Sequence, residues 1–434
     1  MQEVLINEIT LILAVALALA VFIMPRKFFL LPFILAACFV PADQRIIIME
    51  LDFTVLRIVI LAGIIRLVLY GETVPMRLTR FDYLILAWGL VGSIVMTIRW
   101  LDAEHAINRL GFLFDLVGLY WIGRQKLRSW DDLRATLRLL AWCGILLAPL
   151  VALEWLQGEN PFTFLGRVAT TIREGRYRCQ AAFPHAIMLG LFWATLAPLF
   201  VGMFRTEARR GLYFWATAAA IFMVGATASS TPVATLLEIL LLLLLFTYRQ
   251  HGKAIAWLTV FMLVMLHLIR EKPVWNLVSR VNLVGGSTGW HRFYLIDQAI
   301  RRFKEWALLG TQDTSHWGWG LHDITNEYIL QGVRGGFITM ILFIIILIWA
   351  VKIVGRWSMR PDSWGRQYLA WCLAVSLLGH ALSFIGVSYF GQIMLLWYLM
   401  LAFVGSMVEA ETAPILVREP AYRVDIRTLY PNRA

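Results

Sequence analysis

The chain is divided almost throughout into hydrophobic runs that are long enough, or nearly long enough, to cross a bilayer as helices. A membrane-spanning helix needs about 20 predominantly apolar residues. About thirteen such runs occur, of which the second and fifth are short: 8–24, 28–41, 53–70, 81–98, 109–122, 137–156, 184–204, 212–228, 232–248, 254–269, 336–352, 367–386 and 389–407. The sequence therefore predicts an all-α polytopic membrane protein with about 12–13 transmembrane helices.

Composition excludes a soluble alternative. Of the 434 residues, 60% are hydrophobic and 15% are charged, whereas soluble domains carry about 25% charged residues. The formal net charge of +11 favours anionic lipids or anionic substrates as partners, because such surfaces attract basic segments near a membrane. We expect no nucleic-acid partner, since no soluble basic domain is present. No Cys/His spacing typical of a metal site occurs, and we expect no metal or other cofactor.

The distribution of Lys and Arg among the short loops predicts the orientation. Cytoplasmic loops carry an excess of these residues. One set of alternate loops is rich in them, and the opposite short loops hold only Arg45, Arg99 and Arg109. This places the N-terminus outside and the C-terminus in the cytoplasm. The resulting division is 1–269 with ten helices, a large outer loop at 270–335, the C-terminal helices at 336–408 and a cytoplasmic tail at 409–434.

Two outer segments are both long and basic. The segment 157–183 contains four arginines, and the loop 270–335 contains eight basic residues. Arginine binds phosphate groups in a bidentate manner, which suits a pyrophosphate. The candidates for this role are Arg176, Arg178, Arg292, Arg301 and Arg302. An equally open interpretation is that Arg178 and Arg292 anchor the chain to lipid headgroups.

Within the large loop, apolar residues recur at helical spacing. Phe293, Ile296, Ile300, Phe303 and Ala307 fall on one face of a predicted helix, while Arg301 and Arg302 lie elsewhere on it. Such a helix can lie at the headgroup level with its cations near phosphates. The alternative is a surface helix whose basic face is solvated.

A turn rich in Trp, Gly and His follows this helix. Trp319 offers a flat face to a sugar ring, or it anchors the loop to the membrane interface. His322 and Asn326 are four residues apart, so they share a face if the next helix has already begun. A histidine there, or the neighbouring Asp323, could accept a proton from an attacking hydroxyl. The alternative for His322 is a hydrogen-bonded structural residue.

Four segments together resemble the bacterial O-antigen ligase/polymerase superfamily of membrane glycosyltransferases. These are Tyr177–His185 with Leu189-Gly190, then Ser229–Thr231, then Ser287–Arg292 with Leu309-Gly310, and finally Thr325–Ile329 with Arg334–Gly336. The similarity covers about residues 165–345. Two departures occur, since Thr231 stands where the family has an arginine and Thr325 where it often has a histidine. They favour a capsular or exopolysaccharide polymerase branch.

The resemblance implies a fold like that of the GT-C glycosyltransferases in the bacterial inner membrane. It also implies metal-independent transfer from an undecaprenyl-diphosphate-linked glycan to a glycan acceptor on the periplasmic face. By position, Arg178 and Arg292 would hold the diphosphate, and the site of Asn326 and Tyr328 would serve the acceptor. His322 or Asp323 would replace the family's histidine. A chain-length regulator and a flippase of the same pathway would be further partners, beside membrane lipids.

Three functions are consistent with these features. The preferred one is polymerisation of lipid-linked repeat units of O-antigen, capsule or exopolysaccharide. A ligase that transfers the finished glycan to a lipid A core or another acceptor would use the same donor and site. A transporter of polysaccharide or lipid-linked sugar belongs to another class, and it would place its site at mid-membrane on broken helices. A non-catalytic membrane scaffold of a polysaccharide machine is a further alternative. Replacing Arg178, Arg292 or His322 with Ala separates it from an enzyme, because only an enzyme would lose polymer formation.

Overall fold

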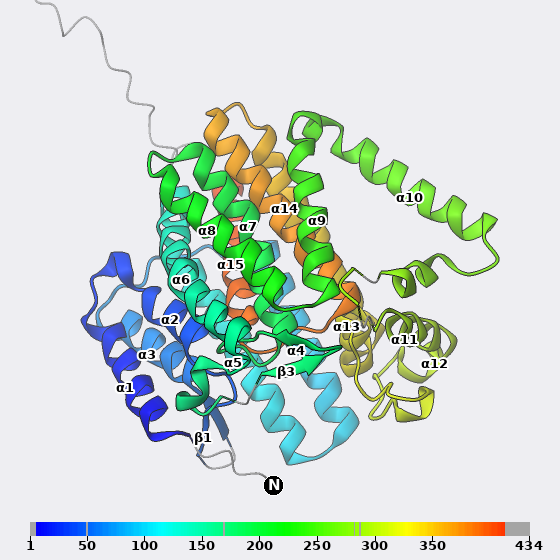
Figure 1. The fold of residues 1–434 in the computed structure, drawn as a ribbon, viewed down its shortest axis with the longest axis horizontal. Coiled ribbons are helices and arrows are strands. Elements are labelled where there is room, and N and C mark those ends of the chain that lie inside the picture. The colour runs from blue at the N-terminus through cyan, green and yellow to red at the C-terminus, as the bar shows by residue number, and fades with distance from the viewer. Residues whose placement is uncertain (1–5, 49–50, 168–169, 282, 286–287, 413–434) are drawn as a thin grey trace, which may run out of the picture.

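The computed structural model describes residues 6–48, 51–167, 170–281, 283–285 and 288–412, and the chain in these ranges is mostly helical. Figure 1 shows the helices gathered in one bundle, with α10 projecting to the side. The expected all-α architecture of a polytopic membrane protein is confirmed. The strands of the described residues form two short antiparallel hairpins, β1 (Arg45–Ile48) with β2 (Leu51–Thr54) and β3 (Thr171–Arg173) with β4 (Arg176–Arg178).

Among the described residues, seven helical segments are long and apolar enough to cross a membrane. They are α4 (Arg80–Trp100), α6 (Trp130–Gln157), α7 (Ala186–Thr206), the continuous run Ser230–Ile269, α13 (Glu327–Met359), α14 (Trp364–Gly386) and α15 (Ile393–Thr412). Two shorter apolar helices are α1 (Glu8–Ile23) and α8 (Arg210–Ala226). Helices α7, α14 and α15 lie deepest in the bundle, with most of their residues buried.

This number is smaller than the predicted 12–13 for identifiable reasons. Two predicted spans fall in the run Ser230–Ile269, which is counted once although α9 (Ser230–Leu244) and α10 (Gly252–Ile269) extend in different directions on either side of a 3-10 segment, η3 (Leu245–His251) (Figure 1). The predicted spans 28–41 and 53–70 correspond to the short helices α2 (Leu31–Phe39) and α3 (Val55–Leu69). The fifth falls within α5 (Ala103–Lys126), which also carries charged residues.

Basic loops meet at the end of the bundle where α15 ends. Arg124 lies 3.1 Å from Glu409, Arg134 lies 3.2 Å from Glu207, and Arg360 lies 2.7 Å from Glu411. Capping boxes at Thr79 and Ser129 begin α4 and α6 at this same end. The alternate loops that are rich in Lys and Arg thus lie at one end of the molecule, and acidic side chains neutralise part of their positive charge.

The two long basic segments lie at the opposite end, where Figure 1 places β3, α11 and α12. The segment after α6 contains η2 (Pro161–Leu165) and the β3–β4 hairpin, and the large loop contains η4 (Val274–Arg280), α11 (Gly289–Arg301), α12 (Phe303–Trp306) and η5 (Ser315–Trp317). The large loop has a small core of its own with the start of α13, which includes Leu295, Trp306, Trp317, Leu321 and Val333.

Helix α11 packs against the protein with residues beside the predicted apolar face, which is expected to lie at the membrane surface. Its buried residues are Gly289, Arg292, Leu295 and Ala299, and Ile300 is 50% exposed. Residues spaced by three and four positions do share a face, but the face that packs inward carries an arginine. The apolar residues on the other face are free to contact lipid.

Helix α13 begins at Glu327, eight residues before the predicted end of the large loop at 335, and it is broken at Gly336. The φ of Gly336 is 75°, a left-handed value that favours glycine. The break exposes backbone groups, and the turn after α12 satisfies them. Phe337 donates its N–H to Ala307 O at 2.7 Å, and Thr311 donates to Val333 O at 2.9 Å. These two hydrogen bonds connect the large loop to α13 at the break.

Helix α10 is the one described helix of the run Ser230–Ile269 that stands away from the bundle (Figure 1). None of its residues is buried. Its main contacts are with η3 at one end and η4 at the other. A helix that is hydrophobic on all sides without protein neighbours is stable only where lipid surrounds it, so α10 is suited to a lipid environment and links the bundle to the large loop.

Candidate functional site

Arg178 is buried at the end of β4 and reaches the start of α9. Its Nη2 donates a 2.9 Å hydrogen bond to Ser229 Oγ, and the residue is 8% exposed. Ser229 in turn donates to the carbonyl of Thr227 at 2.9 Å, which fixes the direction of its lone pairs. The segment 157–183 thus places a guanidinium group beside the first residues of a membrane helix.

Arg292 comes from the other basic segment and reaches the same region. It is 7% exposed on α11. A Cβ built on Gly386, the last residue of α14, would lie 3.5 Å from Arg292 Nε and 3.4 Å from Thr231 Oγ1. The side chains of Arg292 and Thr231 therefore approach one point, which Gly386 leaves open because it has no side chain.

The two segments also touch directly. Ser230 Oγ accepts a 3.3 Å hydrogen bond from Val284 N, and Val284 O accepts one of 3.0 Å from Arg176 Nη1. Ser229 therefore contacts Arg178, Ser230 contacts the large loop, and Thr231 lies near Arg292. The neighbouring Gly286 and Ser287 of the predicted Ser287–Arg292 motif lie outside the described residues.

The electrostatics of this cluster are those of cations without a counter-ion. Burial and the nearby charge of Arg173 lower the pKa of Arg178 below its ordinary value and that of Arg292 to about 10. Both groups stay protonated at neutral pH. Within the described part of the chain neither forms an ion pair with a carboxylate, and both Nε atoms are buried without a partner. Since buried charges are normally paired, this site favours an anion.

His185 lies at the edge of the cluster and caps α7. Its Nδ1 accepts a 3.1 Å hydrogen bond from Ile187 N. Burial and the charges of Arg178, Arg167 and Arg173 lower the pKa of His185 to about 4, so the imidazole is neutral at pH 7. Because Nδ1 accepts, the proton is on Nε2. His185 can therefore donate to a bound anion, and it is unsuited to act as a base while it caps the helix.

The remaining predicted arginines are not part of this cluster by their recorded contacts. Arg301 pairs with Asp297 at 2.7 Å and its side chain is 70% exposed. Arg302 pairs with Glu305 at 2.9 Å. Arg176 is exposed and its recorded bond is to the backbone at Val284. These three residues are held by partners that Arg178 and Arg292 lack.

The predicted base and stacking residues lie on the exposed turn before α13. His322 and Asp323 are both exposed, and Trp319 is 90% exposed, whereas the neighbouring Trp317 is 2% exposed in the small core. His322 and Asn326 do not share a helical face, because Asn326 is the N-cap and the helix begins only after it. No recorded contact joins His322 or Asp323 to Arg178 or Arg292.

Asn326 and Tyr328 both bind the end of α14. Asn326 caps α13 by accepting from Ile329 N and donates to Ile385 O at 2.9 Å. Tyr328 donates its hydroxyl hydrogen to Ala381 O at 2.8 Å. Their bonds hold the start of α13 next to Gly386, with Thr325 immediately before them. The hydroxyl of Thr325 is buried without a partner, as is that of Thr231, so the region offers unused polar atoms.

The sequence did not single out Arg173, Thr231, His185 and Gly386 as site residues. Thr231 and His185 occur inside two of the quoted motifs, so a signal was present. Gly386 gave none, because a glycine at the end of a hydrophobic run is common. Arg173 was one of four arginines in its segment, and the β3–β4 hairpin, which pairs it with Arg176 and places its charge within reach of Arg178, was not predicted.

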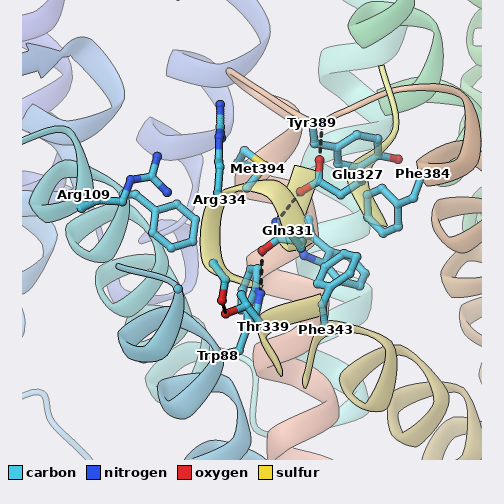
Figure 2. A pocket seen from close by; sticks show the side chains of 14 residues that line it. Trp88, Arg109, Glu327, Gln331, Arg334, Thr339, Phe343, Phe384, Tyr389 and Met394 are labelled. Carbon is cyan, nitrogen blue, oxygen red and sulfur yellow. Dashed lines mark hydrogen bonds between the residues drawn. The ribbon is translucent and has the colours of Figure 1, made fainter. Parts of the chain in front are cut away.

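A pocket lies beside this site, between α4, α5, α13 and the segment after α14. Figure 2 shows Arg109 and Arg334 close together on one side of it and Glu327 further in. Glu327 accepts from Tyr389 N at 2.8 Å and from Gln331 Nε2 at 2.6 Å. Among the described residues there is no group of three or more His, Cys, Asp or Glu that would hold a metal ion.

These features define the chain as a multi-pass helical membrane protein with a buried, uncompensated arginine cluster at one end of its bundle. No protein-family model, curated protein or solved structure matches it. Any assignment of function therefore depends on the chemistry of the site.

Proposed function

We propose that the protein is a membrane glycosyltransferase that polymerises lipid-linked polysaccharide repeat units, and that the arginine cluster holds the diphosphate of the donor. The observation that carries the proposal is the approach of Arg178 and Arg292, from two separate basic segments, to one place without a carboxylate partner. A diphosphate supplies the missing negative charge, and each guanidinium group can bind it with two parallel hydrogen bonds.

The position of the cluster suits a diphosphate that is attached to a lipid. Ser229 immediately precedes α9, Gly386 ends α14, and His185 immediately precedes α7. The cluster thus lies where three membrane helices end, at the depth of lipid headgroups. A polyprenyl chain can run along the helices while its diphosphate lies among the arginines. The outside location of this end follows from the distribution of Lys and Arg between the loops.

The proposed reaction is a displacement at the anomeric carbon of the donor sugar. A hydroxyl oxygen of the acceptor glycan forms a bond to this carbon, and the bond from the carbon to the diphosphate oxygen breaks with its electron pair. The hydroxyl proton goes to a base, for which His322 and Asp323 remain our candidates. Arg178 and Arg292 stabilise the charge that develops on the leaving diphosphate, and the Nε2–H of His185 adds a neutral donor.

The test uses the purified full-length protein in nanodiscs. We expect undecaprenyl diphosphate to bind more tightly than the monophosphate, and R178Q and R292Q to weaken the binding of the diphosphate at least tenfold. R301Q, which removes an exposed arginine that already has a partner, is the matched control and should bind like the wild type. Equal binding of both lipids, or unchanged binding in R178Q and R292Q, would refute the proposal.

The products distinguish polymerase from ligase. With a lipid-linked repeat unit as the sole substrate, a polymerase forms long chains on the carrier lipid. A ligase leaves the chain length unchanged and transfers glycan to a core-lipid acceptor when one is added. Long chains made without any other acceptor would support polymerisation, and transfer only to the added acceptor would replace that assignment by the ligase.

A further inference from the structure

A second cavity, with a volume of about 670 Å³, lies between the β1–β2 hairpin, α5 and the segment that joins α14 to α15. Small-molecule sites commonly have volumes of about 300–1,000 Å³. The cavity adjoins the pocket of Figure 2, since Arg109, Phe112, Arg334, Tyr389 and Met394 line both. It is therefore large enough for a ligand and continues inward toward Glu327.

Two of the arginines in the wall of this cavity have no ion-pair partner among the described residues. Arg45 pairs with Asp52 at 2.6 Å, Arg57 pairs with Asp115 at 2.8 Å, and Asp43 pairs with Arg167 at 2.5 Å. Each of these acids is occupied. Arg109 and Arg334 form no ion pair within the described residues, and they lie within electrostatic reach of each other. The carboxylate of Glu327 offsets part of their charge, but its two oxygens are bonded to Tyr389 N and Gln331.

The wall also contains buried polar atoms that form no hydrogen bond with any group of the described residues. They are Asp52 Oδ1, Arg109 Nε, Gln392 Oε1 and the hydroxyl of Tyr398, and all four residues line the cavity. Buried polar atoms are normally hydrogen-bonded. This set contains donors and acceptors together, which is the pattern that a polyhydroxylated ligand satisfies, because each hydroxyl group both donates and accepts.

Two short segments connect this cavity with the arginine cluster. One runs from Arg178, in the cluster, to Pro184, which lines the cavity. The other runs from Gly386, beside Arg292, to Tyr389 and Gln392, which also line the cavity. Gln392 ties the two segments together, since its Nε2 donates to Ala182 O at 2.7 Å. A ligand in the cavity would lie next to whatever the arginine cluster holds.

We infer that this cavity binds an acidic oligosaccharide, with Arg109 and Arg334 on its carboxylate or phosphate group and the unpartnered polar atoms on its hydroxyls. The inference rests on the proposed function for one point, namely that this glycan is the acceptor. A neutral glycan would leave the two arginines without a counter-ion. The same anionic chemistry could come from a lipid headgroup, and the experiment separates the two sources.

The experiment measures binding of a galacturonic acid oligomer to the full-length protein in phosphatidylcholine nanodiscs, with a galactose oligomer of the same length as the neutral probe. We expect the acidic oligomer to bind at least tenfold more tightly than the neutral one. R109Q and R334Q should each weaken its binding about tenfold or more. R360Q, which removes an arginine paired with Glu411 at the other end of the bundle, is the matched control. Equal affinity for both oligomers, or unchanged affinity in R109Q and R334Q, overturns the inference.

A steric variant serves if an arginine variant fails to fold. Asn108 is exposed and lines the cavity, so N108W narrows it without altering any charge, and we expect it to weaken binding of the oligomer about tenfold. Retained binding in N108W would place the glycan elsewhere. Nanodiscs that contain phosphatidylglycerol test whether a lipid headgroup occupies the site. If phosphatidylglycerol displaces the oligomer from the wild type but has no effect on oligomer binding by R109Q, the anion site belongs to lipid and the glycan assignment is refuted.

The same samples distinguish failure of this inference from failure of the proposed function. We expect R109Q and R334Q to bind undecaprenyl diphosphate like the wild type, because Arg178 and Arg292 are unchanged. Loss of the diphosphate preference in the wild type, with binding of the acidic oligomer retained, would refute the transferase and leave the cavity assignment intact. The reverse result would refute the cavity assignment alone.

Discussion

Buried arginines occur at both ends of the bundle, and the two groups differ in what surrounds them. Arg124 is fully buried, and it lies 2.8 Å from Asp82 and 3.1 Å from Glu409, with Ser406 as a further partner at 3.0 Å. Arg178 and Arg292 are almost as buried, but their recorded neighbours are hydroxyl groups and another arginine. The first arrangement satisfies its charge within the protein. The second leaves its charge without a carboxylate partner among the described residues.

This difference matters because a buried ion pair and an unpaired buried charge have opposite consequences for stability. Removing one partner of a buried pair costs about 3–5 kcal/mol, since the other charge is left uncompensated. Removing one of several mutually repelling cations relieves repulsion. The comparison therefore predicts that substitutions at the two ends separate stability from function.

The largest expected effect is on stability, at Arg124. We expect R124M to lower the free energy of unfolding by about 3–5 kcal/mol, because Asp82 would remain buried without its cation. Thermal unfolding in detergent, monitored by size exclusion, measures this change. R301M removes an exposed pair with Asp297, and such pairs contribute about 1 kcal/mol or less. If R124M were no less stable than R301M, the distinction between the two ends would fail.

The second effect is on activity, at the arginine cluster. We expect R178A and R292A to reduce polymer formation in membrane vesicles about 10²–10³-fold, which is the usual effect of removing one donor that stabilises developing negative charge. Their thermal stability should equal or exceed that of the wild type. A loss of stability similar to that of R124M would show that these arginines hold the fold instead.

The third effect concerns the space in front of Gly386. A methyl group at this position would meet Thr231 at 3.3 Å and Arg292 at 3.5 Å, so G386A fits with small shifts. We expect G386L to project into the space between these groups and to weaken diphosphate binding about tenfold, while G386A changes it little. Isothermal titration of both variants measures the difference. Equal binding by G386A and G386L would place the ligand away from Thr231 and Arg292.

The smallest effect is the dependence of stability on pH at His185. Its pKa is lowered to about 4 in the folded protein, against about 6.5 in the unfolded chain. The unfolded chain therefore binds more protons between these values, and stability falls as the pH is lowered from about 6.5 to about 4. We expect a loss of about 1–2 kcal/mol after solvent screening.

The variant H185N isolates this contribution, because Asn caps a helix well and does not titrate in this range. The thermal stability of H185N should depend less on pH between 6.5 and 4 than that of the wild type. The same slope in both proteins would assign the acid sensitivity to other groups.

The helical membrane fold could be predicted from the sequence because each long hydrophobic run carries the same physical requirement. Backbone polar groups must be satisfied within the segment in a bilayer, so such a run forms a helix. The number of long helices could not be predicted in the same way. The runs 28–41 and 53–70 form only the short helices α2 and α3, and hydrophobicity alone does not determine where a helix begins and ends.

The candidate site was accessible to the sequence only in part. Arg178 and Arg292 stood out as arginines of the two long basic segments, and the structure buries both. The local partners of the other predicted arginines could not be predicted. Asp297 precedes Arg301 by four residues on the same helical face, but an i,i+4 spacing alone does not tell whether a pair forms.

The condition for His322 and Asn326 to share a helical face, that the helix has begun before Asn326, is not met, and the residues contained the reason. Asn is among the best residues for beginning a helix, and the cap at Asn326 excludes His322 from the helix that follows. The cavity near Arg109 and Arg334 had no sequence signal. It is formed by elements far apart in the chain, and the paired or unpaired state of its charges depends on the folded arrangement.

Helix α10, which touches its neighbours mainly at its two ends, has a consequence for which changes the chain tolerates. Its 18 residues extend over about 27 Å at 1.5 Å per residue, close to the roughly 30 Å thickness of a hydrocarbon layer. With none of its side chains buried in the protein, the identity of each apolar residue matters little and their number matters a great deal. Exchanges of Leu, Ile, Val and Phe along it should be silent, whereas deleting one turn would pull the large loop toward the bilayer. The segment acts as a ruler that matches this protein to the thickness of its membrane.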